Sequence, residues 1–177
     1  MKKITIVIFI LCMAPFSLFA AESGMALDSA PVSTTDNASL QRGAESFVNY
    51  CLTCHGASYM RYNRHLDIGF TNDEILSKLI FTGQKVGGLM ESAMQKKEGE
   101  VWFGVSPPDL SVIARSRGAD WLYTYLRAFY RDDTTATGWN NLVFDRAAMP
   151  HVFYQLQGEQ KLVVKTSDKG EQKTLVL

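Results

Sequence analysis

The 177-residue sequence has little of several features, and each shortage narrows the possible functions. Basic and acidic residues number 18 each, so no positive excess favours binding to nucleic acid. Cysteine occurs only three times, so at most one disulfide can form within the chain. No apolar run after the first twenty residues is long enough to span a bilayer. The remaining composition, 46% hydrophobic and 20% charged, is ordinary for one globular domain with a sizeable core.

The first 21 residues are typical of a secretory signal peptide. Two lysines precede an apolar run over residues 4–19, and the small residues Ala20 and Ala21 follow. We expect cleavage after one of these alanines, although the bulky residue three positions before either cut is also compatible with an uncleaved anchor. One cysteine lies inside this segment, so the exported chain carries two, Cys51 and Cys54.

Residues 51–55 read CLTCH, which places two thiols three positions apart and an imidazole directly after them. This is the pattern of c-type haem attachment, in which both cysteines add to the haem vinyl groups and the histidine reaches the iron from the same side. A thiol–disulfide redox pair is one alternative, but no strand precedes Cys51 as in a thioredoxin-like unit. Zinc is another, but it requires four ligands, and His65 and His151 lack the paired spacing of a zinc finger. Export also favours haem, so we predict covalent attachment with His55 as the proximal ligand.

Hydrophobic periodicity predicts helices joined by long ordered loops. One helix is expected from Ser39, its N-cap, to the cysteine motif, where Gly56 stops it. A capping box at residues 71–74 starts another helix. Residues 106–117 and 119–129 carry two further apolar helical faces. The predicted fold class is therefore all-α, a helical haem domain with long ordered loops.

The predicted domain organisation follows from shifts in composition along the chain. After the signal peptide (1–21), residues 22–38 are rich in small and polar side chains and form a flexible lead-in. Residues 39–160 form the haem domain. Residues 161–177 alternate in polarity around a turn, which predicts an exposed tail with a possible short hairpin.

The sixth iron ligand has to come from elsewhere in the chain. A lone methionine is more often core filler than ligand, but Met149 is fixed in a short loop by Pro150 and preceded by small Ala147 and Ala148. His65 is its structural rival. Ligation by histidine and methionine raises the haem potential and leaves no open position, so such a protein moves electrons and makes no bonds. The full set of candidates after the signal peptide is Met25, Met60, Met90, Met94, Met149, His65 and His151.

Two further features have both an ordinary and a functional interpretation. Pro107 and Pro108 either cap a helix or form a wall beside the haem. Arg117 is either a surface residue or the partner of a haem propionate, since a guanidinium fork suits a carboxylate. The residues alone leave both alternatives open.

A series of motifs resembles the cytochrome c1 family, the haem c subunit of the cytochrome bc1 complex, in its bacterial form. The cysteine motif by itself indicates only a c-type cytochrome, and the motifs that follow it in this order make the resemblance more specific. Between about residues 40 and 158, the matching segments are 42–44 (RGA), 50–55 (YCLTCH), 59–66 (YMRYNRHL), 107–111 (PPDLS) with Arg115 and Arg117 after it, and 148–151 (AMPH).

The resemblance implies a cytochrome c-like fold with one covalent haem c. Pro108 would lie beside the haem, and Arg117 would contact a propionate. The residues that the resemblance places on the haem or its iron are Cys51 and Cys54 as attachment sites and His55 and Met149 as axial ligands.

The resemblance also implies a place in a membrane complex. Such a subunit is no enzyme on its own. It joins cytochrome b in a ubiquinol–cytochrome c oxidoreductase, takes electrons from the Rieske iron–sulfur protein and passes them to a cytochrome c, on the periplasmic side of the bacterial inner membrane. Family members end in a transmembrane helix that this sequence lacks, so we expect either a truncated or partial product or attachment only through the N-terminal segment and the partners in the complex. The alternatives are a free periplasmic mono-haem cytochrome c, the c-type subunit of a dehydrogenase, and a zinc-binding structural module.

Overall fold

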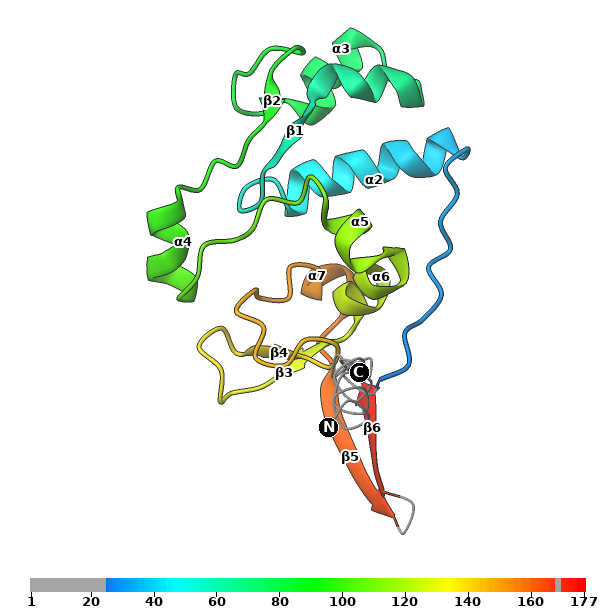
Figure 1. The fold of residues 1–177 in the computed structure, drawn as a ribbon, viewed down its shortest axis with the longest axis vertical. Coiled ribbons are helices and arrows are strands. Elements are labelled where there is room, and N and C mark those ends of the chain that lie inside the picture. Colours follow the sequence, from blue (N-terminus) through cyan, green and yellow to red (C-terminus); the bar gives the residue numbers. More distant parts are fainter. Residues whose placement is uncertain (1–24, 168–169) are drawn as a thin grey trace, which may run out of the picture.

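The structure is a computed structural model that describes residues 25–167 and 170–177, so the predicted signal peptide lies outside the described residues. Helices make up much of the chain, but the all-α prediction is wrong (Figure 1). The described residues also form three two-stranded antiparallel sheets, β1–β2, β3–β4 and β5–β6. Most of these strands have only two to five residues, too short for an alternating pattern to reveal them in the sequence.

Helix α2 (Asn37–Tyr50) leads directly into the cysteine motif. Its N-cap is Asp36, whose carboxylate accepts a hydrogen bond of 3.0 Å from the backbone N–H of Ser39. The prediction of Ser39 as the cap is therefore wrong, because the helix begins two residues before it. At the other end, the N–H of Cys51 still donates to the carbonyl of Phe47. The first cysteine thus lies on the last turn of a helix, in a fixed position.

The segment after the motif packs above α2 in Figure 1 and encloses a first apolar cluster. Thr71 forms the predicted capping box, since its hydroxyl accepts from the N–H of Glu74 and the Glu74 carboxylate accepts from the N–H of Thr71. The elements here are β1 (Ala57–Arg61), the 3₁₀ helix η1 (Tyr62–Ile68), α3 (Asn72–Glu74), the π-helix η2 (Ile75–Leu79) and β2 (Leu89–Met90). The buried residues of this cluster are Val48, Leu52, Tyr62, Phe70, Ile75, Leu79, Ile80 and Met90.

The second half of the chain builds a smaller apolar cluster of Phe129, Trp139 and Ala147, against which Tyr125 and Met149 pack. The predicted helix from residue 106 instead begins seven residues later, at Ile113, because residues 106–110 form no regular secondary structure. The elements are α4 (Lys96–Phe103), α5 (Ile113–Arg117), α6 (Ala119–Arg127), β3 (Phe129–Arg131), β4 (Trp139–Asn141) and α7 (Tyr154–Gln157).

The last two strands, β5 (Lys161–Ser167) and β6 (Gly170–Val176), pair from Lys161↔Val176 to Ser167↔Gly170 and extend away from the body of the molecule (Figure 1). The base of this hairpin is tied to β3, since Arg131 donates its N–H to the carbonyl of Gln160 and its guanidinium to the Glu159 carboxylate at 2.6 Å. No helix among the described residues has the length and apolar character needed to cross a bilayer.

Candidate haem-binding site

An apolar cavity of about 100 Å³ lies at the C-terminal end of α2. Three segments that are distant in the sequence contribute to it, namely the end of α2 with the cysteine motif, residues 103–108, and the loop before α7. Most of the lining is apolar. The lining residues are Tyr50, Cys51, Cys54, His55, Phe103, Val105, Pro107, Pro108, Ala148, Met149, Pro150 and Val152. The fold therefore gathers five of the six predicted site residues around one cavity, all but Arg117.

His55 is oriented by a hydrogen bond of 2.7 Å between its Nδ1 atom and the backbone carbonyl of Pro108. A carbonyl oxygen only accepts, so Nδ1 carries the proton and the lone pair is on Nε2. Metal-ligating histidines are held in the same way, by a hydrogen bond on the nitrogen that does not bind the metal. The tautomer of His55 therefore suits an axial ligand.

The two cysteines are free thiols in this structure. Burial, and secondarily the charge of Cys54, raises the pKa of Cys51 to about 11, and burial also raises the pKa of Cys54. A thiol–disulfide redox pair depends on a lowered pKa, because the thiolate is the reactive form. The surroundings of these thiols therefore do not favour that alternative.

A zinc site has no support in the described part of the chain, where no three His, Cys, Asp or Glu side chains gather as metal ligands. Haem attachment needs only the two thiols and one imidazole near an apolar cavity. The residues present at this cavity fit that group.

Pro107 and Pro108 form one wall of the cavity and are not part of a helix. The backbone groups of this segment make hydrogen bonds to the cysteine loop instead. The carbonyl of Pro108 contacts His55, and the N–H of Leu110 donates to the carbonyl of Gly56 at 2.7 Å. Helix α4 packs on the same wall. A methyl group on Gly99 would lie 2.5 Å from Pro107, so only glycine permits this close approach.

Asp109 links this wall to β1 by hydrogen bonds. Its carboxylate accepts hydrogen bonds from the backbone and hydroxyl of Ser58, at 2.9 and 2.7 Å, and from the backbone of Ser111 at 2.8 Å. Burial opposes the charged form, but the hydrogen bonds from both serines outweigh it and hold the pKa of Asp109 well below its usual range. The charged carboxylate is therefore the form that joins residues 51 positions apart in the sequence.

Replacing Asp109 with asparagine is expected to lower the free energy of unfolding by about 1 kcal/mol at pH 7, because charge-assisted hydrogen bonds are lost at a largely solvated site. The folded-state pKa lies below the unfolded value of about 3.9, so this stabilisation is present above pH 4 and is lost as the pH falls through the folded-state pKa. Urea unfolding at pH 7 and pH 3 measures the difference. Asp133→Asn, at an exposed carboxylate, is the matched control, and an equal loss in both variants would contradict the prediction.

Met149 packs against the second apolar cluster. The Tyr125 hydroxyl donates a hydrogen bond to its sulfur at 3.5 Å, and burial raises the pKa of Tyr125 to about 12, so the hydroxyl remains a donor at neutral pH. Tyr125 is fixed in turn by rings on both sides, stacked on Trp121 at 4.9 Å and edge-on to Phe129 at 5.1 Å. No local sequence pattern predicts this contact, since it joins two residues 24 positions apart.

Tyr125→Phe is expected to lower the midpoint potential of the holoprotein by about 40 mV. The phenyl ring keeps the packing but removes a hydrogen bond of about 1 kcal/mol, and about 1.4 kcal/mol corresponds to 59 mV for one electron. Without the donor, the sulfur gives more electron density to the iron and favours the oxidised form. A redox titration monitored by visible absorption measures the shift, and an unchanged or higher potential would contradict it.

Two asparagines that were not predicted as site residues, Asn140 and Asn141, hold the loop before Met149. The carboxamide oxygen of Asn140 accepts from the backbone of Asn141 and of Arg146, both at 2.8 Å, and its nitrogen donates to Asp132 and Asp145. Both asparagines are almost wholly buried. Two adjacent asparagines in a turn-rich segment are the only sequence feature that could have indicated this structural role.

Arg117 does not line the cavity. Its guanidinium lies over the ring of Trp121, 5.0 Å from the centroid, and the side chain is exposed. The propionate role implied by the resemblance stays a prediction.

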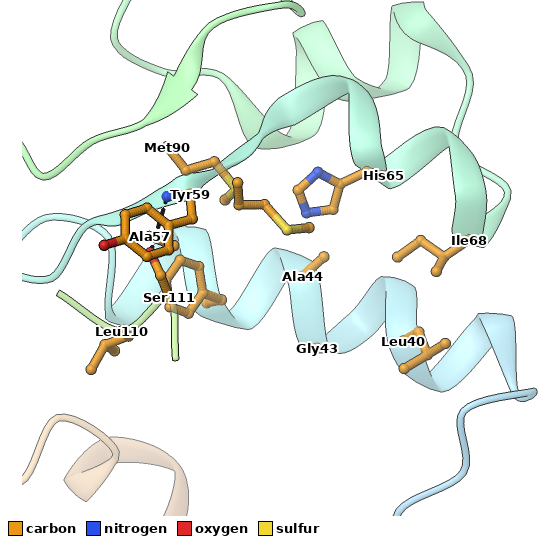
Figure 2. A pocket seen from close by; sticks show the side chains of 12 residues that line it. Leu40, Gly43, Ala44, Ala57, Tyr59, His65, Ile68, Met90, Leu110 and Ser111 are labelled. Carbon is orange, nitrogen blue, oxygen red and sulfur yellow. Dashed lines mark hydrogen bonds between the residues drawn. The ribbon is translucent and has the colours of Figure 1, made fainter. Parts of the chain in front are cut away.

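The structure separates His65, the rival sixth ligand, from the cysteine motif. It lines a different pocket with Met60 and Met90, between α2 and η1, where its ring points over Ala44 (Figure 2). Its Nδ1 atom is 2.8 Å from the carbonyl of Tyr62. Of the candidate sixth ligands, Met149 is the one that lines the same cavity as His55.

Comparison with known proteins agrees with a haem c site. A model of the Cytochrome C1 family matches residues 28–100. The chain is 45% identical to cytochrome c1 of Allochromatium vinosum, over 94% of this chain and 68% of that protein. It is 60% identical to a Nitrosomonas europaea protein named ammonia monooxygenase gamma subunit, over 92% of this chain and 69% of that protein. A cytochrome c1 of Rhodospirillum rubrum matches 55% of the chain at 29% identity.

The cavity and its thiol–imidazole motif define a c-type haem protein. More specifically, the chain belongs to the cytochrome c1 family. Membership of this family implies a covalently bound haem c and a role in electron transport.

Proposed function

We propose that this chain is the electron-carrying haem c subunit of a cytochrome bc1 complex. It takes electrons from a Rieske iron–sulfur protein and passes them to a cytochrome c. The observation that carries the proposal is the pairing of His55, with its Nε2 lone pair free, and the Met149 thioether at one apolar cavity. Histidine–methionine ligation raises the haem potential, as electron transfer to a cytochrome c requires.

The residues of the site have separate roles in this proposal. Haem c, attached to Cys51 and Cys54, supplies a one-electron redox centre. His55 and Met149 would hold its iron and would leave no ligand position open for a substrate. The apolar wall that contains Pro107 and Pro108 would lie beside the haem. Arg117 would pair with a propionate.

The proposed organisation has residues 39–160 as the haem domain and the β5–β6 hairpin as an appended tail. The domain would work on the periplasmic side of the inner membrane, held there by cytochrome b and the Rieske protein or by the N-terminal segment. The family relationship supports this location.

The test uses the holoprotein, matured with haem in a bacterial periplasm. We expect haem to stay on the chain in a denaturing gel and to be lost in Cys51→Ser/Cys54→Ser. The oxidised protein should show the weak sulfur-to-iron band near the red end of the visible spectrum. Quinol should then reduce the protein only when cytochrome b and a Rieske protein are present, and cytochrome c should reoxidise it. Reduction that does not depend on these partners would overturn the assignment to a bc1 complex.

A second candidate is the c-type subunit of another oxidative enzyme. The name of the Nitrosomonas europaea relative, which associates that protein with a monooxygenase, favours it. The haem site would be the same, and only the partners would differ. Co-purification of the tagged chain with cytochrome b and a Rieske protein, or with subunits of a different enzyme, decides between the two.

A further inference from the structure

We propose that His151 is a reserve axial ligand, which binds the haem iron when Met149 is lost from it. This inference rests on the proposed haem site but goes beyond it. His151 is 2% exposed, and neither of its ring nitrogens has a hydrogen-bond partner among the described residues. Buried polar groups nearly always have a partner, so an imidazole with two unpaired nitrogens calls for an explanation.

Packing alone holds the side chain of His151 in place. Its ring is stacked on Phe129 at 5.2 Å between centroids and lies edge-on to Trp139 at 5.1 Å. Neither contact satisfies a ring nitrogen. Release of the ring from this position would break no hydrogen bond.

The position of His151 in the chain brings it within reach of the site. It follows Met149 with only Pro150 between them, so the two Cα atoms are separated by no more than about 7 Å. Both side chains meet the same second cluster, since Met149 packs against it and His151 stacks on its Phe129. Ala148, Met149 and Pro150, which directly precede His151, all line the cavity.

The other imidazole outside the motif does not share these properties. His65 has a hydrogen bond to Tyr62 and faces the separate pocket beside α2 (Figure 2). It therefore serves as the internal control. Ligation by two histidines gives a lower potential than ligation by histidine and methionine, so recruitment of His151 would lower the potential of the carrier without loss of haem.

The experiment compares oxidised holoproteins by visible absorption and electron paramagnetic resonance. Met149→Ala opens space at the iron, and we expect a low-spin spectrum typical of two nitrogen ligands, without the sulfur band. Met149→Ala/His151→Leu should lose this spectrum and become high-spin, whereas Met149→Ala/His65→Leu should remain low-spin. A high-spin Met149→Ala protein, or a low-spin Met149→Ala/His151→Leu protein, would overturn the proposal.

Two controls separate this inference from the function proposed above. Added imidazole should return Met149→Ala/His151→Leu to low spin, and failure to do so would count against the proposal, because the pocket itself would then be damaged. His151→Leu alone should keep the sulfur band. If the wild-type protein lacks that band, Met149 is not the ligand and the proposed axial pair fails, whatever the variants show.

Discussion

Met149→Leu is expected to abolish the sulfur-to-iron band of the oxidised protein and to lower its midpoint potential by roughly 0.2 V. Leucine has nearly the same volume and is apolar, so it should preserve the packing of Met149 against the second cluster. It cannot coordinate, and the oxidised iron is then no longer destabilised relative to the reduced form by a weak thioether donor. Axial ligands alter haem potentials over a range of about 0.8 V. We expect the loss of one axial ligand to change the potential by about a quarter of that range.

Visible absorption and a redox titration measure both effects on the same sample. Met90→Leu is the matched control, because Met90 also packs in an apolar cluster, but in the first one, on the separate pocket. It should keep the band and the potential. If Met149→Leu retains both, or if Met90→Leu loses them, the sixth ligand has been assigned to the wrong methionine.

Asn140→Leu is expected to lower the free energy of unfolding by about 3 kcal/mol. Leucine has a similar size but removes the oxygen that accepts from the backbone N–H groups of Asn141 and Arg146. Each unpaired buried donor costs about 1–3 kcal/mol. Arg146 also has a positive φ of 55°, unusual for a residue other than glycine, and the hydrogen bond to Asn140 helps to hold that conformation.

Denaturant unfolding of the holoprotein measures the loss, and the sulfur band reports on the Met149 loop in the native state. We expect the band to weaken, because Asn140 fixes the segment that leads to Met149. Asn49→Leu, the same substitution on the exposed side of α2, controls for the change of side chain and should cost less than about 1 kcal/mol. An Asn140→Leu protein as stable as this control would show that the network does not hold the loop.

Features that depend on neighbouring residues could be predicted from the sequence. The cysteine motif predicted the chemistry, since the spacing of two thiols and an imidazole is itself the requirement for attachment. The Thr71 capping box was also predictable, because both partners lie within one helical turn. Helix α6 starts at Ala119, the first residue of the predicted helix 119–129.

Features that depend on contacts between distant residues were decided only by the tertiary structure. The strands were missed because each short strand is stabilised by its partner and not by its own sequence. Residues 106–110 were expected to be helical, but their polar groups bind the cysteine loop, more than fifty positions earlier in the chain. No local pattern carries that information.

The sequence by itself predicted haem attachment at residues 51–55 and limited the sixth ligand to seven candidates. It could not choose among them with certainty, because a methionine has the same local character as a core residue and as a ligand. The tertiary structure placed Met149 at the cavity of His55 and placed His65, Met60 and Met90 at another. The physical reason is that an axial pair is defined by distance in space, and 94 positions of chain separate these two residues, 55 and 149.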